Sequence, residues 1–406
     1  MEENKKSSKF ASRVKELKEQ FISFFSCEPE DAFTSPGRIE LLGNHTDHNN
    51  GNVLVSTIDL NILALSSPIR ENKVIIYSFG FPIMEVSLDN LEKKNNEEGD
   101  SISIVRGILY KMKEAGYNLG GFIASTSTTV FKGGGVSSSA AFELLIAKIM
   151  SFYYNDDQID PVELAKICRF AEVEYFNKPC GLLDQMGISL GAINYIDFKD
   201  NDKPYIKTIR TSFPNYDFIL VNCKDSHSSL THLYKKIQND MFLLASYFNK
   251  KVLRDVSRRD FMSAQDELIE KFGEDVFLRG KHYFEENDRV RKAKDALFNK
   301  NQKEFIRLVN ESGESSYYQL KNCYVNNENE NLPRGILKSK EIIKDGAVRV
   351  HGGGFAGTIL AIVNKDEVNS YIKEMRKMFG YHNVRKITTN RFGTRFICKV
   401  KDVVEE

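Results

Sequence analysis

Residues 130–143 read VFKGGGVSSSAAFE, in which a strand-like run meets three glycines, then three serines and then an apolar helix. Three consecutive glycines let the backbone approach a ligand closely, and serines at a helix start leave amide groups and hydroxyls facing an anion. The stretch therefore predicts a phosphate cradle. It matches neither the GxxxxGK[ST] nor the GxGxxG pattern, so a flexible loop capped by a serine stays open as the alternative.

A polar and charged cluster precedes this loop in the chain. Residues 35–54 read SPGRIELLGNHTDHNNGNVL, and eleven positions of this stretch include the hydrogen-bonding side chains of Arg38, His45, Asp47 and His48. Such density between strand-like segments favours a binding site. A solvated hairpin turn at residues 50–51 is the alternative, because a lone histidine is more often structural than a ligand.

Two later segments add further candidates. Residues 171–191 read AEVEYFNKPCGLLDQMGISLG and place Asp184 between apolar residues after a Cys-Gly turn. A carboxylate in such surroundings must be paired, hydrogen-bonded or shifted in pKa, which makes it a candidate for proton transfer, with a helix cap as the alternative. Residues 348–358, VRVHGGGFAGT, again set glycines after a strand, which is a weak signal alone.

The composition narrows the class of protein. The chain has 406 residues, 41% of them hydrophobic, and its 57 basic and 56 acidic residues leave a net charge of +1. This balance argues against nucleic acid or an anionic membrane surface as a partner. The six cysteines form no CxxC pair, and we find neither a signal peptide nor a run of about 20 apolar residues. We therefore expect reduced thiols and a cytoplasmic location. We also expect a monomer.

The periodicity of apolar residues predicts mixed α+β content. Strands are expected at residues 52–65, 73–79, 122–128, 217–223, 347–351, 358–363 and 395–400. Helices are expected near residues 14–24 and at 101–115, 138–154, 162–175, 230–248, 263–272, 282–299, 303–313 and 365–379. The pattern becomes more helical near residue 205, so we place a domain boundary there, between residues 1–205 and 206–406.

Taken together and in order, the four segments resemble the signature of galactokinases within the GHMP kinase family. Residues 36–54 are similar to the family's PGRxNLIGEHxDYNxGxVL motif, and GGGVSSSA at 133–140 to its GLSSSA-type loop. Residues 180–185 match the CGxxDQ block, and 352–357 the late glycine motif. The agreement spans the chain from residue 35 to about 360. A single glycine run would not justify stating this resemblance.

The resemblance implies roles for individual residues. Asp184 would be the catalytic carboxylate that accepts the proton of the sugar hydroxyl, and Arg38 the arginine that orients it. Ser139 and Glu172 would hold Mg²⁺, whose ligands are hard oxygens. The residues expected to cradle the phosphates of ATP are Gly133, Gly134, Gly135, Val136, Ser137, Ser138 and Ser139. The residues expected to bind the sugar are Asn44, His45, Asp47, Gly181 and Tyr234.

Three residues depart from the family motif. Asn44 stands where galactokinases have glutamate, His48 where they usually have tyrosine, and Glu40 where they have asparagine. Losing the glutamate charge would lift the repulsion against a sugar acid, and galacturonokinase relatives also lack that glutamate and carry the histidine. We therefore rank galactose first and galacturonate or another sugar altered at carbon six second. A sugar sensor of the same fold, which binds without catalysing transfer, is a third hypothesis.

The resemblance also implies an architecture. We expect the two-lobed GHMP kinase fold, with an N-terminal domain like ribosomal protein S5 and a C-terminal α/β domain, and with the active site in the cleft between them. ATP as the phosphoryl donor, Mg²⁺ and a small sugar are the expected partners. The expected reaction transfers the terminal phosphoryl group of ATP directly to the anomeric hydroxyl of the sugar.

Overall fold

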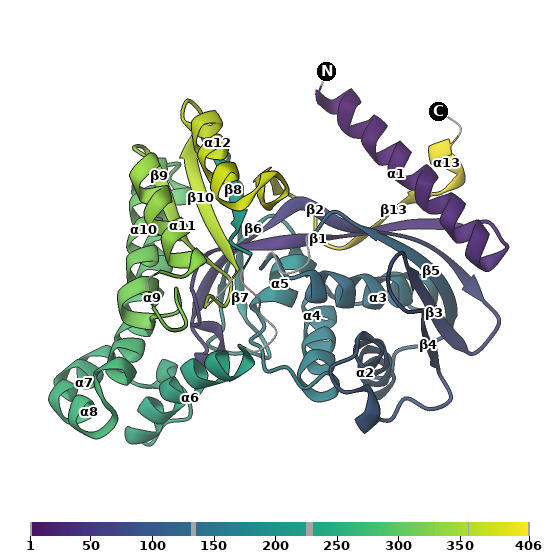
Figure 1. Cartoon of the computed structure of the whole chain (residues 1–406). Coiled ribbons are helices and arrows are strands. Elements are labelled where there is room, and N and C mark those ends of the chain that lie inside the picture. The colour runs from purple at the N-terminus through teal and green to yellow at the C-terminus, as the bar shows by residue number, and fades with distance from the viewer. Residues whose placement is uncertain (1, 131–134, 225–229, 328, 356, 405–406) are drawn as a thin grey trace.

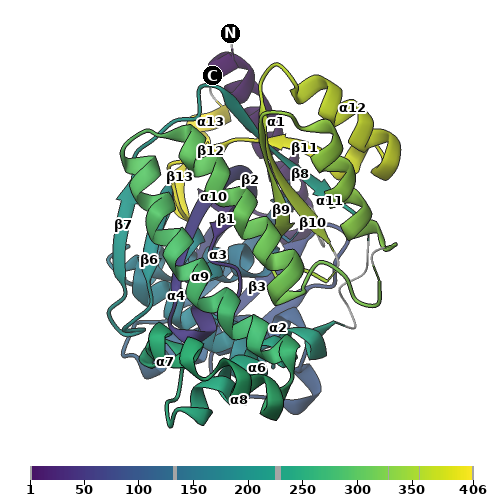
Figure 2. The ribbon, with the colours of Figure 1, turned by 90° about the vertical axis from the view of Figure 1, so that its left-hand side faces the viewer.

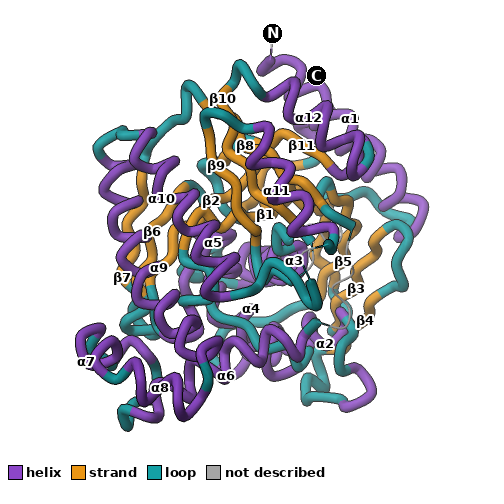
Figure 3. Tube along the Cα trace, turned by 60° about the vertical axis from the view of Figure 1, so that its left-hand side comes forward, coloured by secondary structure: helices purple, strands orange, loops and turns teal. Residues whose placement is uncertain are grey.

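The structure is a computed structural model that describes residues 2–130, 135–224, 230–327, 329–355 and 357–404. Within these ranges the strands form a nine-stranded sheet and a four-stranded sheet, and helices surround both (Figure 1). Figure 3 shows the strands running through the molecule from β7 at one edge to β3 and β4 at the other, with most helices above and below them. The mixed α+β content expected from the sequence is confirmed.

The helices are α1 (Glu2–Phe25), α2 (Ser101–Glu114), α3 (Ser138–Tyr154), α4 (Pro161–Phe170), α5 (Leu183–Leu190), α6 (Thr231–Tyr247), α7 (Arg258–Ser263), α8 (Gln265–Phe272), α9 (Glu274–Phe298), α10 (Gln302–Ser315), α11 (Asn331–Ile342), α12 (Val368–Phe379) and α13 (Lys401–Val404). The strands are β1 (Asp31–Leu42), β2 (Asn52–Ile69), β3 (Lys73–Ser78), β4 (Met84–Ser87), β5 (Gly121–Thr128), β6 (Ile193–Asp197), β7 (Tyr205–Ile209), β8 (Tyr216–Asn222), β9 (Gly346–His351), β10 (Thr358–Asn364), β11 (Val384–Ile387), β12 (Thr389–Asn390) and β13 (Arg395–Lys399).

The larger sheet has the order β13-β1-β2-β5-β3-β4, and the long strand β2 also pairs with β6 and β12. Its strands are antiparallel except for the parallel pair β3 and β5. Alternate side chains of β2 point to opposite faces, because the side-chain period of a strand is two. Leu63 and Leu65 pack with α1, whereas Ile62 and Ala64 belong to the main core. In Figure 1, α1 lies on one side of this sheet and α2, α3 and α4 lie on the other.

The smaller sheet has the order β11-β8-β10-β9 and is antiparallel. Ile219 and Val221 of β8 pack in the cluster that includes α11 and α12. Phe218 and Leu220 point the other way and join the main core, to which α9 and α10 also contribute. Figure 2 shows α9 and α10 running across the front of the molecule beside these strands. One continuous apolar core therefore connects the two sheets.

Strand pairing departs from the division of the chain at residue 205 in two places. β7 pairs with β6, so residues 205–209 belong to the larger sheet. The end of the chain also returns to that sheet, because β12 pairs with β2 and β13 pairs with β1. Local composition could not indicate this return, since it depends on long-range hydrogen bonding. The domain division itself stays a prediction.

Several local expectations need correction. Helix α9 begins at Glu274 rather than at 282, and residues 171–175 form one π-helical turn after α4 rather than a continuation of it. The strand β1 and the helices α5 and α11 were not predicted. None of the six cysteines, all of which lie within the described residues, forms a disulfide. Among the described residues, no helix combines the length and apolar character that crossing a membrane requires.

Candidate active site

Arg38 and Asp184 come from distant parts of the chain and meet as an ion pair. Arg38 lies on β1, and Asp184 is the second residue of α5. The Arg38 Nε and Nη2 atoms lie 2.9 and 2.7 Å from the same carboxylate oxygen, Asp184 Oδ1. The Arg38 side chain is 5% exposed and that of Asp184 34% exposed, so the carboxylate can be reached from solvent while its partner is fixed.

The glycine-serine loop joins this pair. The Ser137 hydroxyl donates a hydrogen bond to the other oxygen of Asp184, and Arg38 Nη1 donates to the Gly135 carbonyl at 2.5 Å. The Arg38 backbone N–H donates to the Val136 carbonyl at 3.2 Å. The loop and the Arg38–Asp184 pair therefore form one hydrogen-bonded unit. Gly133 and Gly134, also expected to cradle phosphates, lie outside the described residues.

The start of α3 has the properties of an anion site. Ser137 precedes the helix in the left-handed region, with φ of 57°, and its side chain makes no capping hydrogen bond because its hydroxyl is bonded to Asp184. The first N–H groups of a helix have no partner within the helix, and the helix dipole adds partial positive charge there. The serine N-cap considered from the sequence is therefore not formed, and the amides near Ser138 and Ser139 can face an anion.

The two expected magnesium ligands lie side by side. The Ser139 hydroxyl is 3.2 Å from Glu172 Oε1, and Glu172 is 2% exposed. Gln185 Nε2 donates to the other Glu172 oxygen at 2.7 Å, and the Lys178 ammonium contacts Oε1. A hydroxyl and a carboxylate are ligands that suit Mg²⁺, so these residues fit the ion. Within the described ranges, no group of three or more His, Cys, Asp or Glu side chains is arranged as a metal site.

A second buried carboxylate was missed by the sequence reading. Glu143 is fully buried four residues after Ser139, and its Oε2 atom accepts from Gln185 Nε2 at 3.0 Å. Its Oε1 atom has no partner among the described residues. Burial, followed by the charge of Glu172, raises the pKa of Glu143 well above its usual range. The sequence signal that could have indicated this carboxylate is the i, i+4 spacing of Ser139 and Glu143, which places the two side chains on one face of the helix.

Three of the side chains expected to bind the sugar form hydrogen bonds with backbone carbonyls of the late glycine motif. The Asn44 side chain donates from Nδ2 to the Gly352 carbonyl at 2.8 Å. His45 donates from Nε2 to the Gly353 carbonyl at 2.9 Å, and the Tyr234 hydroxyl donates to the Gly354 carbonyl at 3.2 Å. The motif lies between β9 and β10 of the smaller sheet, whereas Asn44 and His45 follow β1 of the larger one. The first three glycines of this weak sequence signal thus offer backbone carbonyls that orient Asn44, His45 and Tyr234.

The protonation of His45 follows from its contacts. Burial lowers the pKa of His45 to about 4, so its ring is neutral near pH 7. Because Nε2 donates to a carbonyl, Nδ1 is left as a hydrogen-bond acceptor. The ring stacks on Tyr234, with 6.4 Å between centroids, and burial raises the pKa of Tyr234 to about 12. Both side chains are therefore neutral hydrogen-bonding groups.

Asp47 and Gly181 are brought together, and Asp47 reaches the helix that carries Asp184. Asp47 Oδ2 accepts from the backbone N–H of Leu183, the first residue of α5, at 3.3 Å. A Cβ atom at Gly181 would lie only 1.7 Å from Asp47 Oδ2, so no other residue fits without moving the carboxylate. Burial raises the pKa of Asp47, and the charge of Asp184 raises it further.

The three departures from the family motif occupy different environments. Asn44 is 1% exposed, and its Oδ1 accepts from Asn322 Nδ2 at 2.8 Å and from the Ser316 hydroxyl at 3.3 Å. Its side-chain oxygen is therefore engaged within the protein. Glu40 is buried and pairs with Arg349 at 2.8 Å. Burial raises the pKa of Glu40 to about 7, and the Arg349 charge opposes this shift.

His48 lies beside His45, with 5.8 Å between ring centroids. The Asn49 amide is 2.9 Å from His48 Nδ1 and donates to it, which leaves the proton on Nε2. Nε2 is buried and has no partner among the described residues. Burial lowers the pKa of His48 to about 3, so this group is a neutral N–H donor near pH 7.

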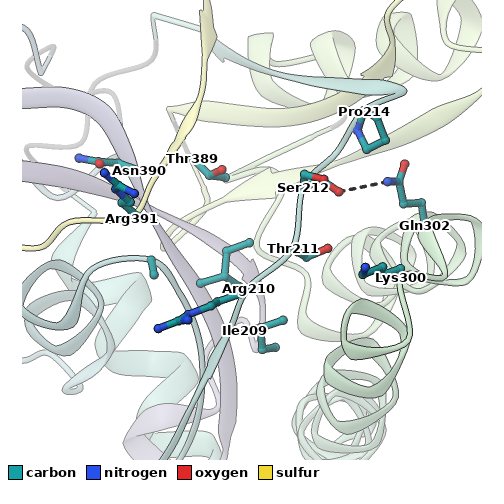
Figure 4. Close-up of a pocket in the computed structure, with 12 residues that line it drawn as sticks. Ile209, Arg210, Thr211, Ser212, Pro214, Lys300, Gln302, Thr389, Asn390 and Arg391 are labelled. Atoms are coloured by element: carbon teal, nitrogen blue, oxygen red, sulfur yellow. Dashed lines mark hydrogen bonds between the residues drawn. The ribbon is translucent and has the colours of Figure 1, made fainter.

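A cavity of about 660 Å³ lies apart from these residues. Its lining includes residues 209–212 and Pro214, from the connection between the larger and the smaller sheet, and residues 389–391, where the chain comes back to the larger sheet (Figure 4). Arg210 and Arg391 lie on one side of it and Lys300 on the other. None of the residues expected to bind sugar, phosphate or metal lines this cavity.

Comparisons with known proteins agree with this arrangement. The model described as the galactokinase galactose-binding signature matches residues 19–68, and the GHMP kinases N terminal domain matches residues 103–192. The galactokinase of Clostridium tetani is 27% identical over 91% of this chain and 94% of its own length. The galactokinase of Staphylococcus carnosus is 29% identical over 89% of this chain and 93% of its own length.

Solved structures agree on the fold. The galactokinase of Lactococcus lactis, solved in complex with galactose, superposes with a TM-score of 0.82 at 24% identity, covering 95% of this chain and 99% of that one. The mevalonate kinase of Methanococcus jannaschii gives a TM-score of 0.61 at 18% identity, covering 89% and 98%. The expected GHMP kinase fold is thereby confirmed. The chain therefore has the GHMP kinase fold, and its sequence is similar to that of galactokinases in the sugar-binding signature and in the GHMP kinase N-terminal domain.

Proposed function

We propose that this protein is a galactokinase, which transfers the terminal phosphoryl group of ATP to the anomeric hydroxyl of galactose and releases ADP. The observation that carries the proposal is the hydrogen-bonded unit of Arg38, Asp184, Ser137 and Gly135. This unit places the solvent-accessible Asp184 carboxylate next to the glycine-serine loop and the start of α3, whose backbone N–H groups can bind phosphates. The galactokinases that resemble the chain over about nine-tenths of its length support the same assignment.

The geometry suggests how the residues would act. Asp184 accepts the proton of the anomeric hydroxyl, and the oxygen then bonds to the γ-phosphorus while the bond to the ADP oxygen breaks. Arg38 fixes the carboxylate and places positive charge beside the transferred group. His45 and Asp47 would hold sugar hydroxyls, as an acceptor at Nδ1 and a carboxylate.

Ser139 and Glu172 would hold Mg²⁺, with the buried oxygen of Glu143 nearby on the same helix face. The ion, when bound, would offset the negative charge of the phosphates. The Lys178 ammonium already contacts Glu172, so ion binding would require this lysine to share or leave the carboxylate. The amides of the loop from Gly135 to Ser139 would contact the phosphate oxygens.

A second candidate substrate has its own supporting observation. No carboxylate stands at position 44, and the buried His48 Nε2–H beside His45 lacks a partner among the described residues. A neutral amide and an unused N–H donor suit a carboxylate on carbon six better than a glutamate would. Galacturonate is therefore the alternative to galactose.

The test is a coupled assay of ADP release over a panel of hexoses and uronic acids. The proposal expects the highest kcat/KM with galactose, and phosphorus NMR of the product should show an anomeric phosphate. A much higher kcat/KM with galacturonate would reverse the ranking. Sugar-dependent nucleotide binding with no ADP release would instead favour a sensor.

A further inference from the structure

His351 occupies a buried position behind the glycine-serine loop. It is the last residue of β9 and is 2% exposed. Its Nε2 atom lies 3.1 Å from the backbone nitrogen of Glu40 and accepts that N–H, at a place where the register of β1 against β2 shifts. The histidine thus links the smaller sheet to the strand that carries Arg38.

This contact determines which ring nitrogen holds the proton. Burial, with the charges of Arg38 and Arg349, keeps the pKa of His351 well below its usual range, so the ring is neutral. Since Nε2 accepts a hydrogen bond, the single proton is on Nδ1. Nδ1–H is then a buried donor, and it has no hydrogen-bond partner among the described residues.

A second unpaired group lies on the neighbouring strand. Thr358 begins β10 directly opposite His351 in the β9–β10 register, and it is fully buried. Its hydroxyl also has no partner within the described part of the chain. Two buried polar groups at paired positions of neighbouring strands therefore lack a hydrogen-bond partner among the described residues. Leaving such a group without a partner is costly in free energy, so native proteins rarely retain one without a use.

Both groups lie next to Gly135. A Cβ atom added there would lie 3.4 Å from His351 Nδ1 and 3.5 Å from the Thr358 Cβ atom. Gly135 is in the left-handed region, with φ of 64°, and its carbonyl already accepts from Arg38. The His351 Nδ1 atom and the Thr358 side chain thus lie against the loop at the residue that joins it to the Arg38–Asp184 pair.

We propose that the His351 Nδ1–H and the Thr358 hydroxyl are phosphate-binding donors that act when a nucleotide occupies the glycine-serine loop. The inference rests on the proposed function, because it takes the loop to hold the phosphates of ATP. A phosphate oxygen has free lone pairs and negative charge, and hydrogen bonds to charged groups are stronger than those between neutral groups. The two residues would bring the smaller sheet into contact with the nucleotide.

Three substitutions separate this role from a structural one. Thr358→Val removes only the unpaired hydroxyl and keeps the shape of the side chain. His351→Gln can still accept the Glu40 N–H at the position of Nε2 but lacks the donor at Nδ1. His351→Asn keeps a donor near Nδ1 and loses the contact with Glu40. Ser66→Ala is the control, because the buried Ser66 hydroxyl is already bonded to the Ile123 carbonyl at 2.8 Å.

The measurement is the Kd of ADP and of a non-hydrolysable ATP analogue by calorimetry without sugar, beside the thermal midpoint of each variant. We expect Thr358→Val and His351→Gln to raise the Kd of the ATP analogue about tenfold. Thr358→Val should unfold at the wild-type temperature or above, since it loses no satisfied bond. His351→Asn should unfold at a lower temperature with a smaller change in Kd. Ser66→Ala should lower only the thermal midpoint.

The proposal is overturned if Thr358→Val and His351→Gln bind the ATP analogue as the wild type does, as they would if a buried water satisfied both donors. It is also overturned if His351→Gln and His351→Asn lose affinity equally. A wild-type protein that binds nucleotide but does not phosphorylate galactose would contradict the proposed function and leave this inference standing. A wild type that binds no nucleotide would refute both.

Discussion

At the scale of single residues, the site depends on polar groups that are buried and kept neutral. His45, His48 and His282 all have pKa values lowered to about 4 or below by burial. His282 is fully buried, and its Nε2 donates to the Asn44 carbonyl at 2.9 Å. A histidine held neutral in the folded protein makes stability depend on pH, because the unfolded chain takes up the proton first.

Acid should therefore destabilise the fold in part through His282. Its pKa is about 4 when folded and about 6.5 when unfolded. The contribution is complete above pH 6.5 and is lost as the pH falls from 6.5 to 4, at about 1.4 kcal/mol per pH unit. Urea unfolding at pH 7.5 and 5.0 should show a loss about 2 kcal/mol larger for the wild type than for His282→Gln. Equal losses would contradict the assignment.

At the scale of elements, the glycine segment 352–354 orients Asn44, His45 and Tyr234, which are expected to bind the sugar, through its carbonyls. A Cβ atom at Gly353 would lie 2.5 Å from Tyr234 Cε1, and one at Gly354 would lie 2.2 Å from the Asn322 carbonyl oxygen. Gly354 also has φ of 82°, which side chains rarely adopt. Close approach thus requires glycine at both positions, and the carbonyls of residues 352–354 support Asn44, His45 and Tyr234.

A Gly353→Ala variant should bind sugar poorly while binding nucleotide normally. The added methyl group displaces the Tyr234 ring, and the bond from its hydroxyl to Gly354 is lost. We expect the KM for galactose to rise about tenfold, the effect of losing roughly 1.4 kcal/mol of binding. Tyr234→Phe, which keeps the ring and loses only the hydroxyl, should show a smaller rise. An unchanged KM in Gly353→Ala would remove the supporting role of the segment.

The elements also show where the sequence was informative. Strongly periodic segments such as α3 and β8 were predicted within about a residue, because each satisfies its own pattern of apolar residues. The strand β1 was not predicted, since Pro36, Gly37, Arg38 and Glu40 read as a polar loop. The polar groups of Arg38 and Glu40 are satisfied by Asp184, Arg349 and His351, which are distant in the sequence.

For the candidate site too, local motifs could be predicted from the sequence and long-range contacts could not. The motif residues around Arg38 and Asp184 were recognisable because each motif is contiguous, and the structure brings them together. The burial of Glu143 and the unpaired donors of His351 and Thr358 could not be predicted, because they depend on which side chains the fold places nearby. Asn44 was expected to contact the sugar, but its side-chain oxygen is engaged with Asn322 and Ser316.

At the scale of the whole molecule, the two sheets are held together beside the site by a buried ion pair. Arg349 of β9 is fully buried, and its Nη2 lies 2.8 Å from Glu40 Oε1 of β1. Arg349 Nη1 also donates to the Leu41 carbonyl at 2.9 Å. His351, on the same strand, accepts the backbone N–H of Glu40, so hydrogen bonds fix β1 against β9 at several points. The position of Arg38 relative to the smaller sheet follows from this contact.

Breaking the ion pair on one side should destabilise the whole fold. Arg349→Met leaves the Glu40 carboxylate buried without its partner, which typically costs about 3–5 kcal/mol. The double variant Glu40→Leu with Arg349→Met should recover a large part of this loss, because two apolar side chains of similar volume often replace a buried pair well. Urea unfolding of the three proteins is the measurement. A single variant within about 1 kcal/mol of the wild type would refute the role of the pair.

The most direct test of the proposed galactokinase is the rate of galactose-dependent ADP release by the wild type and by Asp184→Asn. The asparagine keeps the size of the side chain but cannot accept the proton, so kcat should fall by about 10²–10⁴-fold while the Kd of the ATP analogue changes little. Turnover by Asp184→Asn near the wild-type rate would contradict the account, as would a wild-type protein that releases no ADP with any sugar.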